Sequence, residues 1–299
     1  MKLDAYMLVR NEKYWLPMSL KSIYDLCDKI FIIDNGSTDG SDEIAKSFGS
    51  KVEVIYMPGD GFADPKTNEV TLRNVGIRAC LDDGADMILR WDADEILYEN
   101  QEEKIRDLYY DTEYGAWKFQ CHRFVSDFHW VQDLREGEPG FMVEGSYELE
   151  GWGRQSGQGK LVLFRANPNL HYVPDPHYLG LHSSEFESVV PRRYRMVDIW
   201  YIHGEWCRSN KRLYQKTLLY YSLVADPNDY CHTEEFLSSI DPENIFKEQR
   251  LRPFGLRPQE SSLPVYMEGF TLPVRTIVER DENGRIYVAR RIWEGDDAI

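Results

Sequence analysis

The sequence M-I-L-R-W-D-A-D-E at residues 87–95 joins an apolar run to three carboxylates. A short apolar run after Gly84 predicts a buried strand, and the carboxylates fall where that strand leaves the sheet. Open α/β sheets bind their ligands at this edge. If the chain stays extended there, Asp92 and Asp94 point the same way and can hold a hard divalent cation. The alternative is that Asp94 and Glu95 only begin the next helix, because acidic residues favour first turns.

Strand and helix patterns alternate along the chain before this stretch. Apolar runs predict strands at 3–9, 30–33 and 52–56, and helical spacing predicts helices at 16–27, 41–48 and 71–81. Short connections between such elements are typical of parallel βαβ units with right-handed crossovers. The first hundred residues are therefore predicted to form a doubly wound, nucleotide-binding half.

No glycine-rich phosphate loop follows the first predicted strand. That strand ends in Arg10, Asn11 and Glu12, where a dinucleotide-binding fold needs G-x-G-x-x-G, and a P-loop is also missing. A phosphate ligand would then need a metal ion or arginines. Asp92 and Asp94, together with Arg73, supply that alternative.

Composition narrows the class of protein further. The 299 residues carry a formal net charge of -16, which makes general nucleic-acid binding unlikely. Five scattered cysteines without a C-x-x-C pair predict a reducing, cytoplasmic setting and no zinc or disulfide framework. No apolar run approaches membrane length, so we expect no transmembrane anchor.

The second part of the chain has a different pattern. A helix is predicted to about residue 110, strands at 117–125, 161–165 and 199–203, and a helix that Ser209 begins and that runs to about 225. Residues 126–159 predict long loops over the site. A hairpin is expected from 273–279 and 285–293, joined at Asn283 and Gly284. We expect one domain at 1–225, with halves 1–100 and 101–225, and an appendage at 226–299.

Four motifs together resemble the GT-A fold glycosyltransferases of family 2. They are V-R-N-E at 9–12, I-I-D-N-G-S-T-D-G-S at 32–41, R-N at 73–74 and W-D-A-D-E at 91–95. W-Y-I-H-G-E-W at 200–206, with the basic helix after it, resembles a histidine-then-helix segment of many members. The resemblance implies a Rossmann-like, mostly parallel sheet flanked by helices, with an irregular acceptor-side region. It also implies inverting transfer of a sugar from a nucleoside-diphosphate sugar, UDP being favoured, to an acceptor hydroxyl.

The resemblance also implies roles for individual residues. Asp34 would bind the uracil or ribose, and Asp94 would be the principal ligand of Mg²⁺ or Mn²⁺. Asp92 would meet the ribose or the metal, and His203 is the candidate second protein ligand. The residues that are expected to bind the nucleotide are Arg10, Asn11, Glu12, Asp34, Arg73, Asn74, Asp92, Arg208 and Lys211. Cations are also expected on physical grounds, because they stabilise the negative charge that develops on the departing diphosphate. Arg212 could contribute to this stabilisation.

Several carboxylates are candidates for the general base, and the sequence does not decide between them. Inversion requires a base on the side of the sugar opposite the leaving group. Asp175 fits the expected order along the chain, and Glu148, Glu144 and Asp133 are the other candidates. His177 is a candidate for the acceptor site. The aromatic residues that could lie under sugar rings, or equally pack in the core, are Trp130, Trp152 and Trp206.

Two rival functions remain at this point. A sugar-phosphate nucleotidyltransferase has a similar sheet but normally begins with a glycine-rich, basic first loop. R-N-E-K-Y-W at 10–15 lacks those glycines. A non-catalytic sugar- or nucleotide-binding scaffold of the same fold is the other rival. Asp34, Arg73, Asp92 and Asp94 together argue against it, because loss of catalysis is expected to lose some of them.

Overall fold

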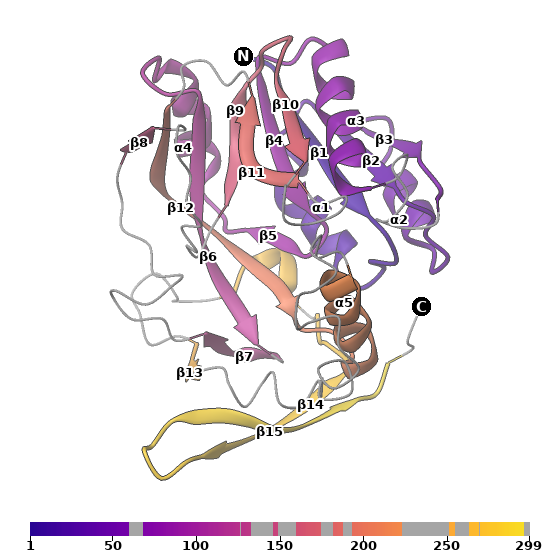
Figure 1. Ribbon diagram of the computed structural model, residues 1–299, viewed down its shortest axis with the longest axis vertical. Coiled ribbons are helices and arrows are strands. Elements are labelled where there is room, and N and C mark those ends of the chain that lie inside the picture. Colours follow the sequence, from indigo (N-terminus) through magenta and orange to yellow (C-terminus); the bar gives the residue numbers. More distant parts are fainter. Residues whose placement is uncertain are drawn as a thin grey trace.

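The computed structural model shows a large curled sheet with helices packed on it (Figure 1). It describes residues 1–59, 68–125, 127–132, 146–148, 160–174, 182–187, 193–222, 251–254, 263–268 and 270–295. The structure confirms the expected mixed α/β class.

The first half is a parallel sheet in the order β3-β2-β1-β4. Its strands are β1 (Leu3–Val9), β2 (Lys29–Asp34), β3 (Val52–Tyr56) and β4 (Met87–Asp92). The order reverses beside β1, so the carboxyl ends of β1, β2 and β4 meet at one edge. This confirms the doubly wound half and fixes where a ligand should bind.

Helices cover both faces of these strands. They are α1 (Leu16–Tyr24), α2 (Ser41–Ser47) and α3 (Glu69–Asp82). Leu20 of α1 packs in a core with Met7, whereas Leu72 of α3 packs in a second core with Tyr6 on the other face. α1 is shorter than predicted, and α3 begins two residues earlier because the Asn68 side chain accepts a hydrogen bond from the Thr71 N–H at 2.9 Å.

The second half extends the sheet by strands of mixed direction. Its elements are β5 (Glu95–Leu97), α4 (Glu102–Asp107), η1 (Leu108–Tyr110), β6 (Ala116–Val125), β9 (Leu161–Arg165) and β12 (Arg193–Trp206). β9 lies antiparallel between β4 and β6, and β12 pairs parallel with β6 and antiparallel with β5. These antiparallel pairings return the chain to the carboxyl end of β4.

The prediction of loops alone at 126–159 was wrong for two short segments. β7 (Asp127–Gln132) pairs with β6, and β8 (Ser146–Glu148) pairs with the start of β12. A separate two-stranded sheet forms from β10 (His171–Pro174) and β11 (His182–Glu187). Such short strands depend on their pairing partners, so alternation along the sequence did not reveal them.

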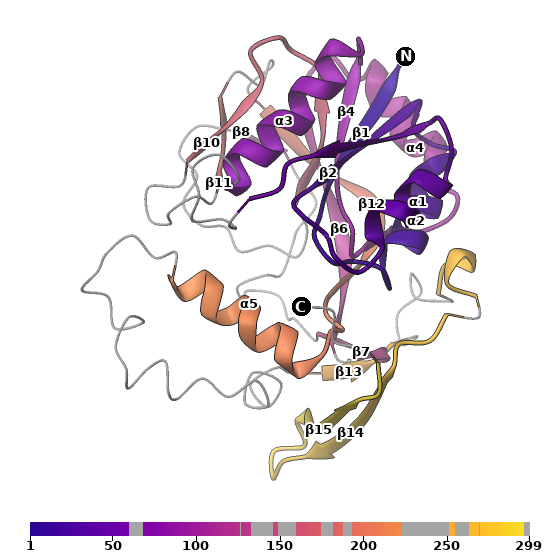
Figure 2. The same ribbon diagram turned by 90° about the vertical axis from the view of Figure 1, so that its right-hand side faces the viewer.

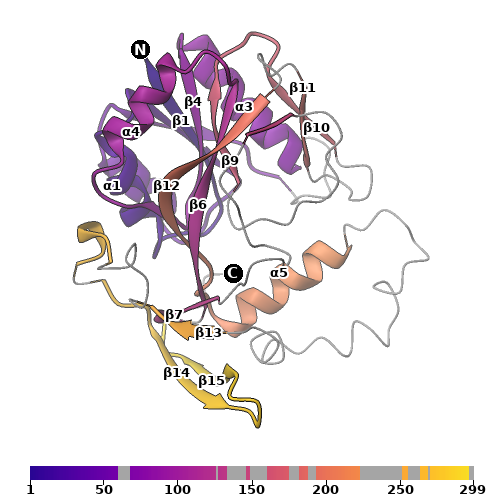
Figure 3. The same ribbon diagram turned by 90° about the vertical axis from the view of Figure 1, so that its left-hand side faces the viewer.

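The C-terminal part joins the same sheet. α5 (Asn210–Ser222) is followed by β13 (Leu251–Pro253), η4 (Val265–Met267), β14 (Val274–Arg280) and β15 (Ile286–Trp293). The β14–β15 hairpin is confirmed, with Gly284 at φ 76°, and it projects at the end of the molecule far from the N-terminus (Figures 2 and 3). β13 pairs with both β7 and β15. The division at residue 225 stays a prediction.

The described residues contain no helix that is both long enough and apolar enough to cross a membrane.

Candidate active site

Polar side chains gather where β1, β2 and β4 end. The strand register sets Val9 of β1 opposite Asp34 of β2, and Leu8 opposite Asp92 of β4. The two aspartates therefore flank the end of β1. This is the arrangement that the sequence predicted for the strand ends.

Asp34 is buried, with 2% of its surface exposed. Its Oδ1 accepts hydrogen bonds from the N–H groups of Gly36 and Ser37, at 2.9 and 3.0 Å. Its Oδ2 is buried without a hydrogen-bond partner among the residues that the structure describes. One oxygen thus shapes the loop after β2, while the other can accept a hydrogen bond from a ligand.

The loop after β1 is tied to the loop after β2. Asn11 has φ 58°, its Oδ1 accepts from the Thr38 N–H at 2.7 Å, and its N–H donates to Ser37 Oγ at 3.1 Å. The Glu12 N–H donates to Ser41 Oγ at 2.8 Å. The Asn11 side chain therefore holds the two loops together, a structural role beyond the nucleotide binding predicted for it.

Asp92 lies between two cations. Arg73 of α3 donates to Asp92 Oδ1 at 3.2 Å, and Lys160 donates to Oδ2 at 2.5 Å. Burial favours the neutral acid, but Arg73 and Lys160 outweigh it and hold the pKa of Asp92 well below its usual range. Arg73 is itself oriented by Glu69, one helical turn earlier, at 2.8 Å from Nε.

Lys160 is a site residue that the sequence analysis missed. It directly precedes β9, and β9 runs antiparallel to β4, so its first residues lie beside the end of β4. Lys160 also contacts Glu95 at 2.6 Å. Burial raises the pKa of Glu95 to about 7 despite this cation. In the sequence, the only sign of a role for Lys160 is its position directly before a predicted strand. The antiparallel pairing of β9 with β4 is what brings Lys160 to Asp92.

Asp94 does not point the same way as Asp92, which corrects the extended-chain expectation. β4 ends at Asp92, and residues 93–94 form a turn before β5. Asp94 Oδ2 accepts from Arg208 at 2.6 Å, and Asp94 Oδ1 lies 3.9 Å from His203 Nε2. Pairing of His203 with Glu95 across β12 and β5 brings the histidine here. The turn separates the two carboxylates, so each meets its own cation.

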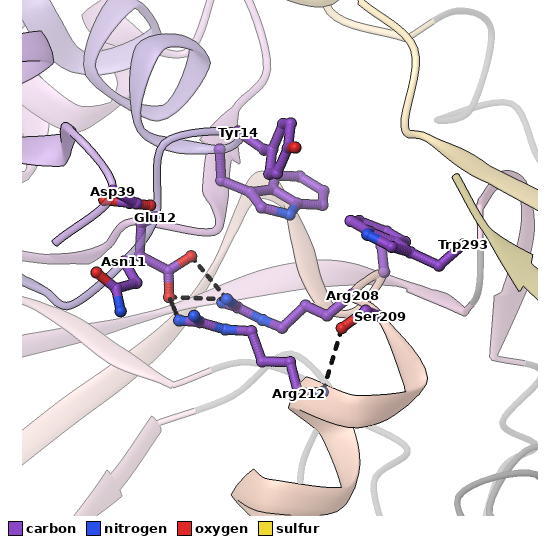
Figure 4. A pocket seen from close by; sticks show the side chains of 10 residues that line it. Asn11, Glu12, Tyr14, Asp39, Arg208, Ser209, Arg212 and Trp293 are labelled. Atoms are coloured by element: carbon purple, nitrogen blue, oxygen red, sulfur yellow. Dashed lines mark hydrogen bonds and ion pairs between the residues drawn. The ribbon is translucent and has the colours of Figure 1, made fainter. Parts of the chain in front are cut away.

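Arg208 joins Asp94 to the loop after β1. Its Nη1 donates to both oxygens of Glu12 at 2.7 Å, and Arg212 adds a contact to Glu12 at 3.0 Å. Figure 4 shows both guanidinium groups converging on the Glu12 carboxylate beside a small cavity of about 30 Å³. Trp293 of β15 also lines this cavity. The Glu12 carboxylate is thus paired with two arginines, a role beyond the nucleotide binding predicted for it.

A divalent ion fits Asp94 and His203 better than Asp92. The 3.9 Å between Asp94 Oδ1 and His203 Nε2 allows one ion to contact both, since such bonds are about 2.0–2.2 Å long. Both Asp92 oxygens already meet cations. No group of three or more histidine, cysteine or acidic side chains able to hold a metal occurs within the described ranges. A metal here would therefore depend on ligand oxygens for the rest of its coordination.

Asn74 ties α3 to β10, a structural role that its predicted nucleotide contact did not include. Its Nδ2 donates to the Tyr172 carbonyl at 3.0 Å, and its Oδ1 accepts from the Tyr172 N–H at 2.8 Å. A side-chain amide has both N–H donors and a carbonyl acceptor, so it can bond the N–H and the C=O of one backbone residue, and α3 thereby holds β10 in place. Asp175 follows the last residue of β10, and Asp175 and His177 themselves lie outside the described residues.

The structure describes only some of the remaining predicted residues. Glu148 ends β8 opposite Arg193, where β12 starts, so its backbone lies away from the carboxyl edge of β4 (Figure 1). Lys211 is exposed on α5, and Arg10 offers its carbonyl to Arg212 at 2.8 Å. For Trp130 in β7 and Trp206 in β12 only the backbone is described. Trp152, Glu144 and Asp133 lie outside the described residues.

The sequence matches the family model described as glycosyl transferase family 2 over residues 4–170, more than half of the chain. The matched range contains the β1, β2 and β4 ends and Lys160. This chain therefore belongs to glycosyl transferase family 2, a family of enzymes. The family match also agrees with the doubly wound first half.

Curated relatives are similar over a shorter range. An uncharacterized glycosyltransferase of Rickettsia typhi is 27% identical over 108 residues, which is 36% of this chain and 33% of the relative. An uncharacterized glycosyltransferase of Rickettsia prowazekii is 26% identical over the same length and shares. The matched segment thus spans about a third of the length of these relatives.

Solved structures resemble the chain at low identity. Staphylococcus aureus TarS is 13% identical with a TM-score of 0.47, covering 87% of this chain and 46% of that chain. Glucosyl-3-phosphoglycerate synthase from Mycobacterium tuberculosis, solved with Mn²⁺ and UDP-glucose, is 16% identical with a TM-score of 0.30, covering 41% and 44%. The family assignment rests on the sequence match and the functional argument on the site itself.

Proposed function

We propose that this protein transfers a sugar, with inversion, from a UDP-sugar to an acceptor hydroxyl and uses Mn²⁺ or Mg²⁺. One observation carries the proposal: Asp34, Asp92 and Asp94 lie at the carboxyl ends of β2 and β4, where buried arginines pair with Asp92 and Asp94. Such an edge is where nucleotides bind to doubly wound sheets. The arrangement supplies groups both for a nucleoside and for a diphosphate.

The nucleoside would lie against Asp34. Its buried Oδ2 accepts no hydrogen bond from the described residues, so it can accept one from a ligand. A uracil ring offers an N–H donor, and a ribose offers hydroxyl donors. Uracil is favoured by the family resemblance. Crystal structures of Staphylococcus aureus TarS, a different protein, contain UDP or UDP-GlcNAc.

The diphosphate would lie between Arg73 and Arg208. Both guanidinium groups are buried, so their charges act in a medium that screens them weakly. Asp94 and His203 would hold the metal ion, which neutralises negative charge on the departing diphosphate when bound. The N-terminal N–H groups of α5 add a favourable field for an anion.

Asp175 is the proposed general base. The two hydrogen bonds between Asn74 and Tyr172 hold β10 beside α3, and β10 ends one residue before Asp175. A carboxylate there can take the proton of the acceptor hydroxyl as it attacks the anomeric carbon. His177, two residues further, is the proposed acceptor contact.

Calorimetric titration of UDP, GDP and dTDP, each with and without Mn²⁺, tests the donor half of the proposal. We expect one nucleotide, UDP, to bind with Mn²⁺ present and to lose most of this affinity in Asp94→Ala. Asp198→Ala is the matched control, because Asp198 is an exposed carboxylate paired with Lys104 at 3.3 Å, away from the site. Its affinity for UDP should equal that of the unmodified protein.

Failure of all three nucleotides to bind with Mn²⁺ present would overturn the transferase proposal and favour a scaffold. If UDP binds, the donor sugar is found by measuring slow hydrolysis of UDP-sugars without acceptor. Asp175→Asn should then abolish transfer while donor binding persists. The anomeric configuration of the product, read by NMR, reports inversion.

A further inference from the structure

We propose that Arg208 is an internal counter-cation of Asp94, so that a divalent ion enters this site only together with the nucleotide diphosphate. The inference rests on the proposed function, because it concerns how the proposed donor and metal bind. It goes beyond that function by assigning Arg208 the task of coupling the two binding events.

Arg208 neutralises the carboxylate that the metal needs: it binds Asp94 Oδ2, whereas Oδ1 lies near His203. Its Nη2 lies 2.6 Å from Asp94 Oδ2, and the residue is 7% exposed. Charge-assisted hydrogen bonds of this length are among the strongest in proteins. A divalent ion that approaches Asp94 therefore meets a carboxylate whose charge is already neutralised.

The ion pairs between Arg208, Arg212, Glu12 and Asp94 balance in charge without a ligand. Arg208 and Arg212 contribute two positive charges, and Glu12 and Asp94 contribute two negative charges. On the other side of the turn, Arg73 meets Asp92 and Glu69, and Lys160 meets Asp92 and Glu95. A divalent ion alone would leave a buried excess of positive charge, which is costly in a medium of low dielectric.

A diphosphate removes this cost. It brings at least two negative charges and oxygen ligands, so Arg208 can turn from Asp94 to the phosphate while the metal takes its place at Asp94. Metal and nucleotide then strengthen each other's binding, and thermodynamic linkage requires the effect to be equal in both directions. The exchange of partners keeps every buried charge paired.

Arg208 is fixed in this position from two sides. Arg291 of β15, itself 6% exposed, donates to the Arg208 carbonyl at 2.6 Å. Glu12 holds the Nη1 end at 2.7 Å. The backbone is thus anchored by the hairpin while the guanidinium lies between two carboxylates. This leaves rotation of the side chain as the simplest way to exchange partners.

The test measures Mn²⁺ binding itself, from the six-line electron paramagnetic resonance signal of the free ion, with and without UDP. We expect weak binding of Mn²⁺ alone to the unmodified protein and binding about tenfold or more tighter with UDP. In Arg208→Met, Mn²⁺ alone should bind about tenfold or more tighter than it does to the unmodified protein. The effect of UDP on Mn²⁺ affinity should shrink accordingly.

Two further variants make the result specific. Arg195→Met, on β12 with its guanidinium 3.7 Å from Asp111, removes the same charge away from the site and should leave Mn²⁺ binding unchanged. The double variant Glu12→Gln/Arg208→Gln removes one charge of each sign, so only Asp94 loses its partner. It should also bind Mn²⁺ alone more tightly, and it provides the answer if Arg208→Met does not fold.

The two proposals fail in different ways. If the unmodified protein does not bind UDP in the presence of Mn²⁺, the proposed function is overturned. If UDP binds, but Mn²⁺ alone binds the unmodified protein as tightly as Mn²⁺ with UDP, the coupling role of Arg208 is wrong. Unchanged affinity for Mn²⁺ alone in the variants without Arg208 would overturn it as well.

Discussion

Asp4 places a carboxyl group inside the first strand, away from the site. Its side chain is fully buried, and this burial raises its pKa to about 7, although the Lys2 ammonium lies 3.8 Å from Oδ2. In an unfolded chain an aspartate titrates near about 3.9. Between about pH 4 and pH 7 the folded protein therefore binds a proton that the unfolded chain has released.

This difference predicts a pH dependence of stability that Asp4→Asn should remove. Because the native state binds more protons in this window, the free energy of unfolding should fall as pH rises, by up to about 1.4 kcal/mol per pH unit from this group. Urea unfolding of both proteins between pH 4.5 and pH 8 measures the effect. The stability of the variant relative to the unmodified protein should rise up to about pH 7 and then level off.

Exposed Asp107→Asn is the control for removing a carboxylate from the surface. Its stability difference from the unmodified protein should show no comparable rise over the same window. A flat difference for Asp4→Asn would show that Asp4 is ionised in the folded protein throughout.

At the scale of elements, α3 approaches β1 closely enough to require a glycine. A Cβ at Gly76 would lie 2.3 Å from the Tyr6 ring, which is itself fully buried and hydrogen-bonded to the Tyr172 hydroxyl at 3.0 Å. The ring cannot move without disturbing β10. The missing side chain at Gly76 therefore sets the distance between α3, with Arg73 one turn away, and the sheet.

Gly76→Ala should destabilise the protein. Overpacking of this kind costs about 1–3 kcal/mol and outweighs the roughly 1 kcal/mol that alanine gains over glycine by helix propensity. Chemical denaturation measures the loss, and calorimetry should show weaker UDP binding because Arg73 shifts with α3. Arg78→Ala, on the exposed side of the same helix, should change stability by less than about 0.5 kcal/mol. Equal effects of both substitutions would contradict the packing argument.

On the scale of the whole molecule, the N-terminal and C-terminal segments share a core. Met267 and Leu272 pack in one cluster with Trp15, Met18 and Ile96. β13 also pairs with β7, so backbone hydrogen bonds cross between the segments. These described residues beyond residue 225 are therefore buried against the N-terminal segment.

We expect the full chain to unfold in a single cooperative transition. Scanning calorimetry at low protein concentration should give one peak with equal calorimetric and van't Hoff enthalpies. Two separate peaks would instead support the predicted division at residue 225 into a domain and an independent appendage. Addition of UDP with Mn²⁺ should move the single peak upward, because both segments contribute to the site through Arg208 and Trp293.

The sequence by itself determined the doubly wound half and the residues at its strand ends. Alternating apolar strands and amphipathic helices are local patterns, and the carboxyl ends of parallel strands meet at one edge wherever such patterns alternate. Asp34, Asp92 and Arg73 could therefore be located without coordinates. The short strands β7, β8 and β10 could not be located in this way, because strands of three to six residues carry too little pattern of their own, and β8 pairs with β12, which is distant in the chain.

Only the tertiary structure decided which charges meet. Lys160 reaches Asp92 because β9 runs antiparallel to β4, and Arg208 reaches Asp94 because β12 returns beside β5. The turn after Asp92 then separates two carboxylates that an extended chain would have aligned. Strand direction and the two-residue turn at 93–94 are set by packing across the whole sheet, so most of the charged residues could be identified from the sequence, but their partners could not.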